Sequence, residues 1–146
     1  MNRIWKRIAI GGVVLFAAIQ LWPVRRTNPP VVGDLAAPPE VASVLRRACY
    51  DCHSNETHWA WYSRLAPFSW LVVHDVDEAR KELNLSEWTQ IPRKRRALAP
   101  QEMLDKIETG AMPLPRYVRM HPQAKLTKDD IETVRRWVEA GHGETD

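Results

Sequence analysis

The feature that most constrains this chain is its single pair of cysteines, Cys49 and Cys52, which His53 follows directly. Two thiols cannot build the disulfide framework that holds small secreted domains together. The run CysTyrAspCysHis instead matches the attachment motif of c-type haem, in which both thiols bond to the porphyrin and the histidine binds its iron. The motif therefore requires the rest of the chain to fold around a large, flat, apolar group.

Two other interpretations of the cysteine pair fit the sequence less well. A thiol–disulfide redox pair is expected beside a βαβ unit, and no such unit is visible. A structural zinc site needs two further closely spaced ligands, and His53 and His58 are poorly placed to supply them. We therefore expect one covalent haem c on Cys49 and Cys52, with His53 as the proximal iron ligand.

The N-terminal segment has the pattern of an export signal. Residues 8–22 carry no charge, and they follow a basic stretch and precede Pro23. Because the run ends without the small residues of a cleavage site, we expect residues 1–24 to be an uncleaved signal anchor or transmembrane helix. The preceding basic residues predict attachment to a bacterial inner membrane, with the C-terminal part in the periplasm. The prolines of residues 25–38 predict an extended linker.

Charge and length restrict the kind of protein that the remaining chain can form. The protein has 21 basic and 18 acidic residues, but Arg3, Lys6 and Arg7 precede the apolar run, so the remainder is balanced. A balanced body lacks the basic face of a nucleic-acid-binding protein, so no nucleic-acid partner is expected. A chain of 146 residues supports one ordinary domain, which we assign to residues 39–146.

Apolar periodicity predicts that this domain is all-α. The residues Val41, Val44, Leu45 and Ala48 recur at helical spacing just before the motif. Further helices are predicted over 67–83, from Pro100 to Gly110, and from the capping residue Thr127 to Gly141. The prolines between Gly110 and Thr127 predict an extended, turn-rich loop. Because no alternating β-branched run occurs, we expect a cytochrome c-like domain of about four short helices.

The second axial ligand of the iron has several candidates: His58, His74, Met103, Met112, Met120 and His121. Met112 is preferred because it follows a predicted helix end and precedes a proline that fixes the backbone. Met103 lies among apolar helix positions, where methionine usually fills the core. For His121, the sequence leaves three roles open: iron ligand, contact to a haem propionate, or ordinary loop residue.

Indole side chains are bulky and apolar, and a haem needs a large apolar wall. We expect Trp59, Trp61 and Trp70 to pack against it.

Residues 40–141 resemble the bacterial haem-binding domain family of small proteins built around the CxxCH motif. Besides that motif, the resemblance is carried in order by Trp61-Tyr62-Ser63, Ser69-Trp70-Leu71, Asn84 with Ser86 and Trp88, Met112-Pro113, and His121-Pro122. The sequence departs from the family pattern at Ala79 and Leu85, where Gly and Phe are usual. The resemblance implies haem binding and says little about a physiological partner.

These features together predict an electron carrier rather than an enzyme. We expect one-electron transfer in the periplasm through iron ligated by His53 and Met112, with an unidentified redox partner protein. The alternative is a haem-based redox or gas sensor with a weak or open sixth site. A peroxidase-like enzyme ranks third, because the chain has one haem motif and no convincing distal acid–base pair.

Overall fold

The computed structural model describes residues 2–141, and within that range the chain forms helices and loops without a β-strand. The predicted all-α class is confirmed. The domain contains α2 (Pro39–Ala48), α3 (Tyr50–His53), α4 (Phe68–Glu82), α5 (Arg93–Glu108), α6 (Pro115–Met120) and α7 (Lys128–Glu139), with the 3-10 turns η1 (Trp61–Arg64), η2 (Trp88–Gln90) and η3 (Pro122–Ala124). The described part of the domain thus adds two short helices, α3 and α6, to the four that periodicity predicts.

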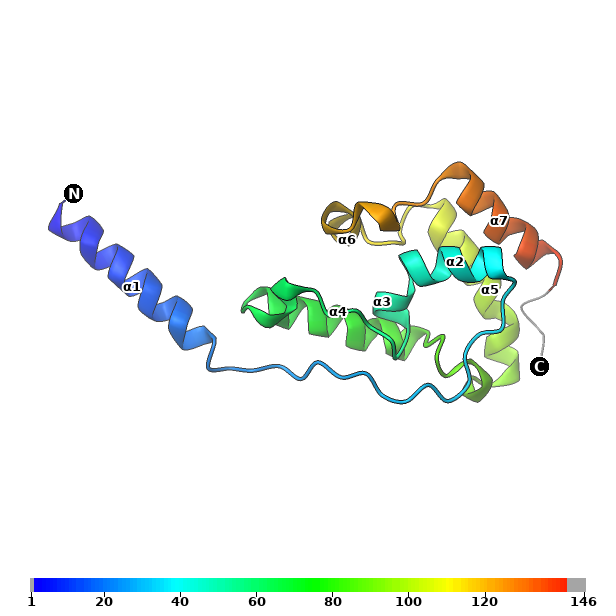
Figure 1. Cartoon of the computed structure of the whole chain (residues 1–146), viewed down its shortest axis with the longest axis horizontal. Helices are drawn as coiled ribbons and strands as arrows, with labels where there is room; N and C mark the ends of the chain where they lie inside the picture. Colours follow the sequence, from blue (N-terminus) through cyan, green and yellow to red (C-terminus); the bar gives the residue numbers. More distant parts are fainter. Residues whose placement is uncertain (1, 142–146) are drawn as a thin grey trace.

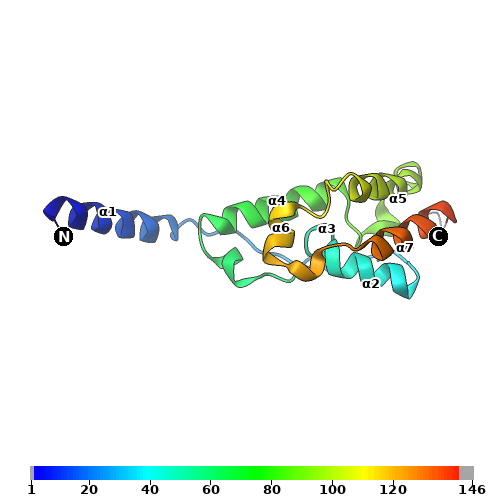
Figure 2. The same cartoon turned by 90° about the horizontal axis from the view of Figure 1, so that it is seen from above.

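The helices α2, α5 and α7 pack around the main apolar core (Figures 1 and 2). All four apolar residues that predicted α2 are buried, as expected from their spacing. The core also receives Leu104 and Ile107 of α5, Val134 and Trp137 of α7, and Leu35, Leu85 and Trp88 from loops and turns. α3 and α4 pack against one another beside this core, so the motif lies at the junction of the two groups of helices.

The N-terminal helix α1 (Arg3–Ile19) extends away from the domain (Figure 1). It has 17 residues, none of them buried, and it includes three basic side chains in its first two turns. A membrane span needs about 20 apolar residues. No helix among residues 2–141 is long and apolar enough to cross a membrane, so the expected transmembrane helix over 1–24 is not supported.

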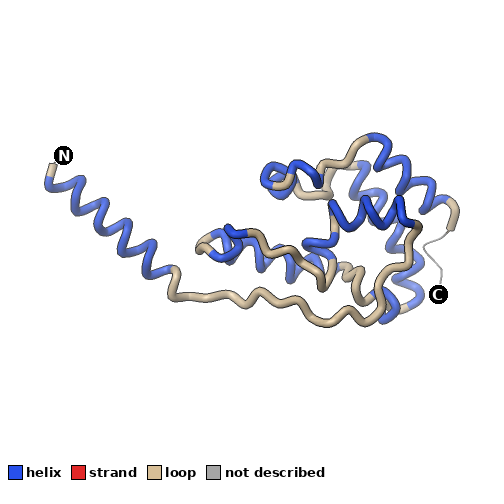
Figure 3. The backbone as a smooth tube through the Cα atoms, in the orientation of Figure 1, coloured by secondary structure: helices blue, strands red, loops and turns tan. Residues whose placement is uncertain are grey.

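The proline-rich segment that follows α1 is extended and lies along the domain (Figure 3). Arg80 of α4 donates to the carbonyl of Thr27 at 2.9 Å, and Asn28 donates to the carbonyl of Thr57 at 2.9 Å. Further along, the amide of Leu35 donates to the carbonyl of Leu85 at 2.9 Å, and the Leu35 side chain is buried in the core. The segment is therefore part of the packed structure.

Two predictions for the region between residues 93 and 127 were wrong. α5 begins at Arg93 rather than at Pro100, so the basic run 93–96 forms its first turn. Arginine, lysine, alanine and leucine are strong helix formers, and their combined preference outweighs the backbone hydrogen bond that Pro100 cannot donate. The predicted extended loop also contains α6, because Pro115 stands at the first helical position, where its missing amide hydrogen costs nothing.

The predicted cap of α7 is confirmed. The Thr127 hydroxyl accepts from the amide of Asp130 at 3.1 Å, and the Asp130 carboxylate accepts from the amide of Thr127 at 2.8 Å. Burial acts to raise the pKa of Asp130, but the hydrogen bonds from Thr127 and Arg47 outweigh it and leave that pKa lowered. The Arg47 contact, at 2.7 Å, joins the cap of α7 to α2.

We predict that Thr127→Ala lowers the free energy of unfolding by about 1 kcal/mol, because it removes the acceptor for a helix-start amide. Denaturant unfolding followed by circular dichroism measures this change. Lys128→Ala, an exposed neighbour, serves as the control and should stay within about 0.5 kcal/mol of wild type. Equal losses in the two variants would contradict the role of the cap.

Candidate functional site

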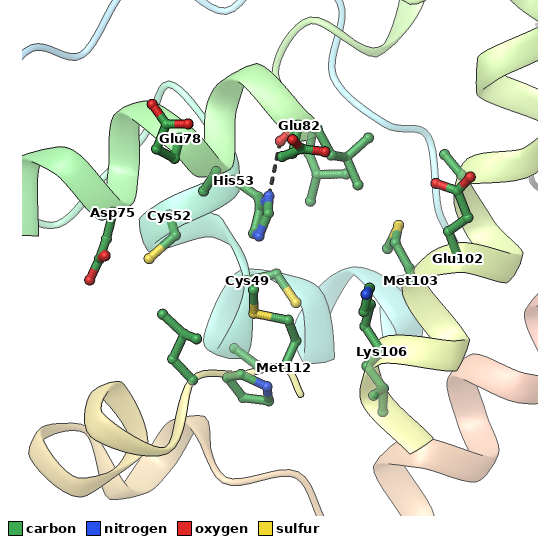
Figure 4. A pocket seen from close by; sticks show the side chains of 18 of the residues that line it. Cys49, Cys52, His53, Asp75, Glu78, Glu82, Glu102, Met103, Lys106 and Met112 are labelled. Carbon is green, nitrogen blue, oxygen red and sulfur yellow. Dashed lines mark hydrogen bonds between the residues drawn. The ribbon is translucent and has the colours of Figure 1, made fainter. Parts of the chain in front are cut away.

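A cavity of about 440 Å³ opens beside the motif. Its walls come from the end of α2, α3, one face of α4, one face of α5 and the loop before α6; they include Cys49, Cys52, His53, Ala79, Leu83, Leu85, Ala99, Met103, Ile107, Met112 and Leu114. The volume lies within the range of cofactor sites, and most of these side chains are apolar. Figure 4 shows the motif side chains and Met112 gathered around this space, which we call the motif cavity.

The His53 ring is held in one orientation. Its Nδ1 lies 3.0 Å from the carbonyl oxygen of Leu83, at the end of α4 (Figure 4). A carbonyl can only accept, so Nδ1 carries the hydrogen of this bond. Burial lowers the pKa of His53, although the hydrogen bond to Leu83 opposes it, so the ring is neutral near pH 7. Nε2 of a neutral ring with Nδ1–H has a free lone pair, which is the form that binds a metal.

The two thiols lie in a setting unlike that of a redox pair. Burial raises the pKa of Cys49 to about 12, with a further contribution from Cys52. Burial, together with the charges of Asp51 and Asp75, raises the pKa of Cys52 to about 11. Thiols that exchange disulfides have lowered pKa values, because the thiolate is the reactive form. This electrostatic setting therefore argues against the thiol–disulfide interpretation.

A cluster of buried polar residues links the motif to the end of α4. Asn84 Nδ2 donates to Asn55 Oδ1 at 2.8 Å, Asn84 Oδ1 accepts from the Ser86 amide at 3.1 Å, and Ser86 Oγ accepts from the Asn55 amide at 3.0 Å. All three residues are at most 7% exposed. The amide of Leu85 also donates to the carbonyl of His53 at 2.7 Å. We call Asn55, Asn84 and Ser86 the polar clamp; it fixes the chain next to the carbonyl that orients His53.

Among the candidates for the second ligand, the structure brings Met112 and Met103 to the motif cavity. Met112 reaches it from the loop after α5, where Gly110 has a φ of 70° and the Met112 amide donates to the carbonyl of Lys106 at 3.0 Å. A positive φ favours glycine, so this turn depends on Gly110. Met103 lines the cavity from α5 and also contacts the core. His121 is absent from the lining of this cavity and lies in another.

Charged side chains surround the motif cavity. Asp75, Glu78, Glu82 and Glu102 line it together with Arg95 and Lys106. Arg95 forms an ion pair with Glu102. Lys106 has no salt bridge with any carboxylate of residues 2–141, and it projects from α5 beside Met103 (Figure 4). Lys106 is thus a cation that could pair with an acidic group of a cofactor.

The donors and walls of the motif cavity fit a haem. The site offers two thiols, a neutral imidazole with a free Nε2, two thioethers, apolar walls and a cation near the edge. Zinc fits less well, because no group of three or more His, Cys, Asp or Glu residues within the described range could hold a metal ion. A haem iron needs fewer protein ligands, since the porphyrin supplies four nitrogens.

Sequence reasoning missed several residues of this region and misplaced others. Leu83 orients His53 through its backbone carbonyl, and a backbone group leaves no sequence signal. Trp59 and Trp61, expected at the haem wall, line the neighbouring cavity rather than the motif cavity, while the Trp70 indole donates to the carbonyl of Trp22 at 3.2 Å. The pairing of Asn84 with Ser86 in the family pattern was the one available signal for the polar clamp.

Comparison with known proteins gives one family match. A family model described as a haem-binding domain matches residues 14–140, which is most of the chain. No curated protein and no solved structure matches.

We predict that Asn84→Ala lowers the free energy of unfolding by about 2 kcal/mol. The change leaves the buried Asn55 Oδ1 and the Ser86 amide without hydrogen-bond partners. Because both groups are shielded from water, no other hydrogen bond compensates for the loss. Chemical denaturation monitored by circular dichroism measures it. Gln123→Ala removes an exposed amide side chain and should change stability by less than about 0.5 kcal/mol. A clamp variant as stable as this control would contradict the prediction.

Proposed function

The chain belongs to the haem-binding domain family, and from that premise we propose that it carries one haem c, bonded to Cys49 and Cys52 and ligated by His53. The observation that carries this proposal is the His53 geometry, with Nδ1 bound to the Leu83 carbonyl and Nε2 free beside both thiols. A histidine that binds a metal usually donates its other ring hydrogen to a carbonyl or carboxylate, which raises its basicity. The apolar walls of the motif cavity suit the porphyrin.

We propose Met112 as the second axial ligand. It lines the same cavity as His53, it is held by the turn at Gly110, and His121 does not line that cavity. The haem supplies a one-electron redox centre when it is bound. With haem bound, His53 and Met112 would ligate the iron, the apolar walls would exclude water, and the charged edge would meet a partner. Lys106 at this edge is the group that we assign to a propionate.

Electron transfer is the function that this arrangement supports best. Two protein ligands leave no open position for a substrate or a gas, and a thioether raises the reduction potential relative to a second imidazole. We propose that the protein works in the bacterial periplasm and exchanges electrons with a redox protein. The export-like N-terminal segment supports the location, and the exposed apolar side chains of α1 would allow contact with lipid.

The covalent bond predicts that haem stays with the polypeptide through acid-acetone extraction and denaturing electrophoresis. In the double variant Cys49→Ala/Cys52→Ala, any bound haem should be extracted completely. Haem staining of the gel and the absorbance of the extract measure both outcomes. Extractable haem in the wild-type protein, or zinc in its place, would refute the covalent assignment.

Axial ligation predicts that Met112→Ala abolishes the weak long-wavelength ferric band of sulfur ligation, lowers the reduction potential, and lets carbon monoxide bind readily. Optical and redox titration of the purified holoprotein measures these effects. Met103→Ala is the sharpest control because Met103 lines the same cavity, and Met120→Ala is a second; neither should change the band.

Two experimental results would replace the proposed ligand or the proposed function. If Met112→Ala leaves band and potential unchanged while His121→Ala alters them, the iron is ligated by two histidines. If the wild-type protein already binds carbon monoxide rapidly, a gas or redox sensor replaces the electron carrier.

A further inference from the structure

A second cavity, of about 530 Å³, lies next to the motif cavity. Cys52, Asp75, Leu114 and Tyr117 line both cavities, whereas Cys49, His53 and Met112 line only the first. The walls of the second cavity are mainly aromatic and aliphatic, among them Trp59, Trp61, Tyr62, Phe68, Leu71 and Val72. We call it the aromatic cavity. Of the residues proposed to hold the haem, Cys52 alone also lines this cavity.

Polar side chains also line the cavity, but Asp51 and Thr57 accept hydrogen bonds and Asp75 is paired with Arg116. Among the imidazoles, His58 is exposed and His121 is half-buried. His121 stacks on Tyr117, with ring centroids 4.2 Å apart and planes inclined by 19°. Its Nδ1 lies 3.2 Å from the backbone carbonyl of Tyr117, which can only accept, so Nδ1 carries a hydrogen there. In the neutral ring Nε2 is then an acceptor. The nearest donor is the Tyr62 hydroxyl, at a long 3.4 Å, so Nε2 can accept a stronger hydrogen bond from a ligand.

The aromatic cavity is also coupled to the haem motif. The Tyr117 hydroxyl donates to Asp51 Oδ2 at 2.6 Å, and Asp51 lies between the two cysteines. Tyr117 therefore separates the cavities and contacts both His121 and the motif. A ring held against Tyr117 and His121 would be separated from the haem motif by the Tyr117 side chain alone.

The position of α1 indicates how a ligand would arrive. Phe16 of α1 lines the aromatic cavity, and Gln20 pairs with Ala66 through two hydrogen bonds of 3.0 and 3.2 Å. The cavity thus opens beside a helix whose apolar side chains are exposed, including Val13 and Leu15. A ligand that dissolves in apolar phases would reach this opening along α1.

We propose that the aromatic cavity binds a planar hydroquinone-type ring, whose hydroxyl donates to Nε2 of His121. Aromatic walls favour a flat ring, the weakly bonded Nε2 of His121 favours a ligand with a hydroxyl donor, and the apolar opening favours a lipid-soluble molecule. The binding is independent of the haem ligands. Its use as an electron donor rests on the proposed function above.

The test is calorimetric titration of the reduced holoprotein with trimethylhydroquinone under anaerobic conditions, so that no electron is exchanged. The matched ligand is its dimethyl ether, which keeps the ring but cannot donate a hydrogen bond. We expect the hydroquinone to bind and the ether to bind about tenfold more weakly, the effect of one lost hydrogen bond. No binding of the hydroquinone would overturn the proposal, as would equal binding of the ether.

Three variants test whether the hydroquinone binds in the aromatic cavity. His121→Phe keeps a ring on Tyr117 but removes the acceptor, so it should weaken hydroquinone binding about tenfold and leave the ether unaffected. Val72→Trp fills the cavity and should abolish binding of both, while an unchanged haem spectrum shows that the fold is intact. His74→Phe, on an exposed position of α4 outside both cavities, should bind like wild type.

Two further outcomes separate this proposal from its rivals. If decanoate binds and the hydroquinone does not, the cavity holds an acyl chain and the proposal is wrong. If Met112→Ala changes the haem spectrum but leaves hydroquinone affinity unchanged, the binding site stands independently of axial ligation. Unchanged affinity in both His121→Phe and Val72→Trp would show that the ligand binds elsewhere and would overturn the assignment.

Discussion

The hydrogen bond from His53 Nδ1 to the Leu83 carbonyl is the contact on which the rest of the site depends. This bond selects the tautomer of His53 and leaves Nε2 free. It forms only if α3 and the end of α4 are held at a fixed distance from each other. The polar clamp supplies that distance, because Asn84 and Ser86 bind the chain on both sides of Leu85 to the residues after His53. A buried polar network of this kind is stable only when every group is paired, so it specifies one arrangement.

The haem motif lies between the motif cavity and the aromatic cavity, which differ in their chemistry. On one side lie His53 and Met112, the proposed ligands of iron, enclosed by α4, α5 and the loop that carries Met112. On the other side lies the aromatic cavity, which contains the half-buried imidazole of His121 and lies beside α1. Tyr117 forms part of the partition, and its bond to Asp51 fixes α6 against the motif helix. Burial and this bond raise the pKa of Tyr117, so its hydroxyl stays a donor across the physiological range.

The apolar periodicity was a sound guide wherever a helix buries one face. α2, α4 and α7 lie where the pattern predicts them, and Thr127 and Gly141 mark the start and end of α7 as expected. The errors occur at prolines. Pro100 starts no helix because the residues before it are already helical, and Pro115 starts one within a segment where three prolines predicted none. A proline restricts its own backbone, but the residues before and after it determine whether it begins a helix or lies within one.

By itself, the sequence determined the all-α class and the caps of the last helix, and it predicted the chemistry of the motif, because these depend on residue type and spacing over a few positions. The tertiary structure alone decided which side chains share a cavity. Met112 and Met103 meet His53 while His121 and two tryptophans line the neighbouring space, although all of them follow the motif in sequence. That division arises from the packing of α4, α5 and α6 around the motif, which no local pattern encodes. The same holds for the Leu83 carbonyl, because every residue has such a group and only the fold aims this one at His53.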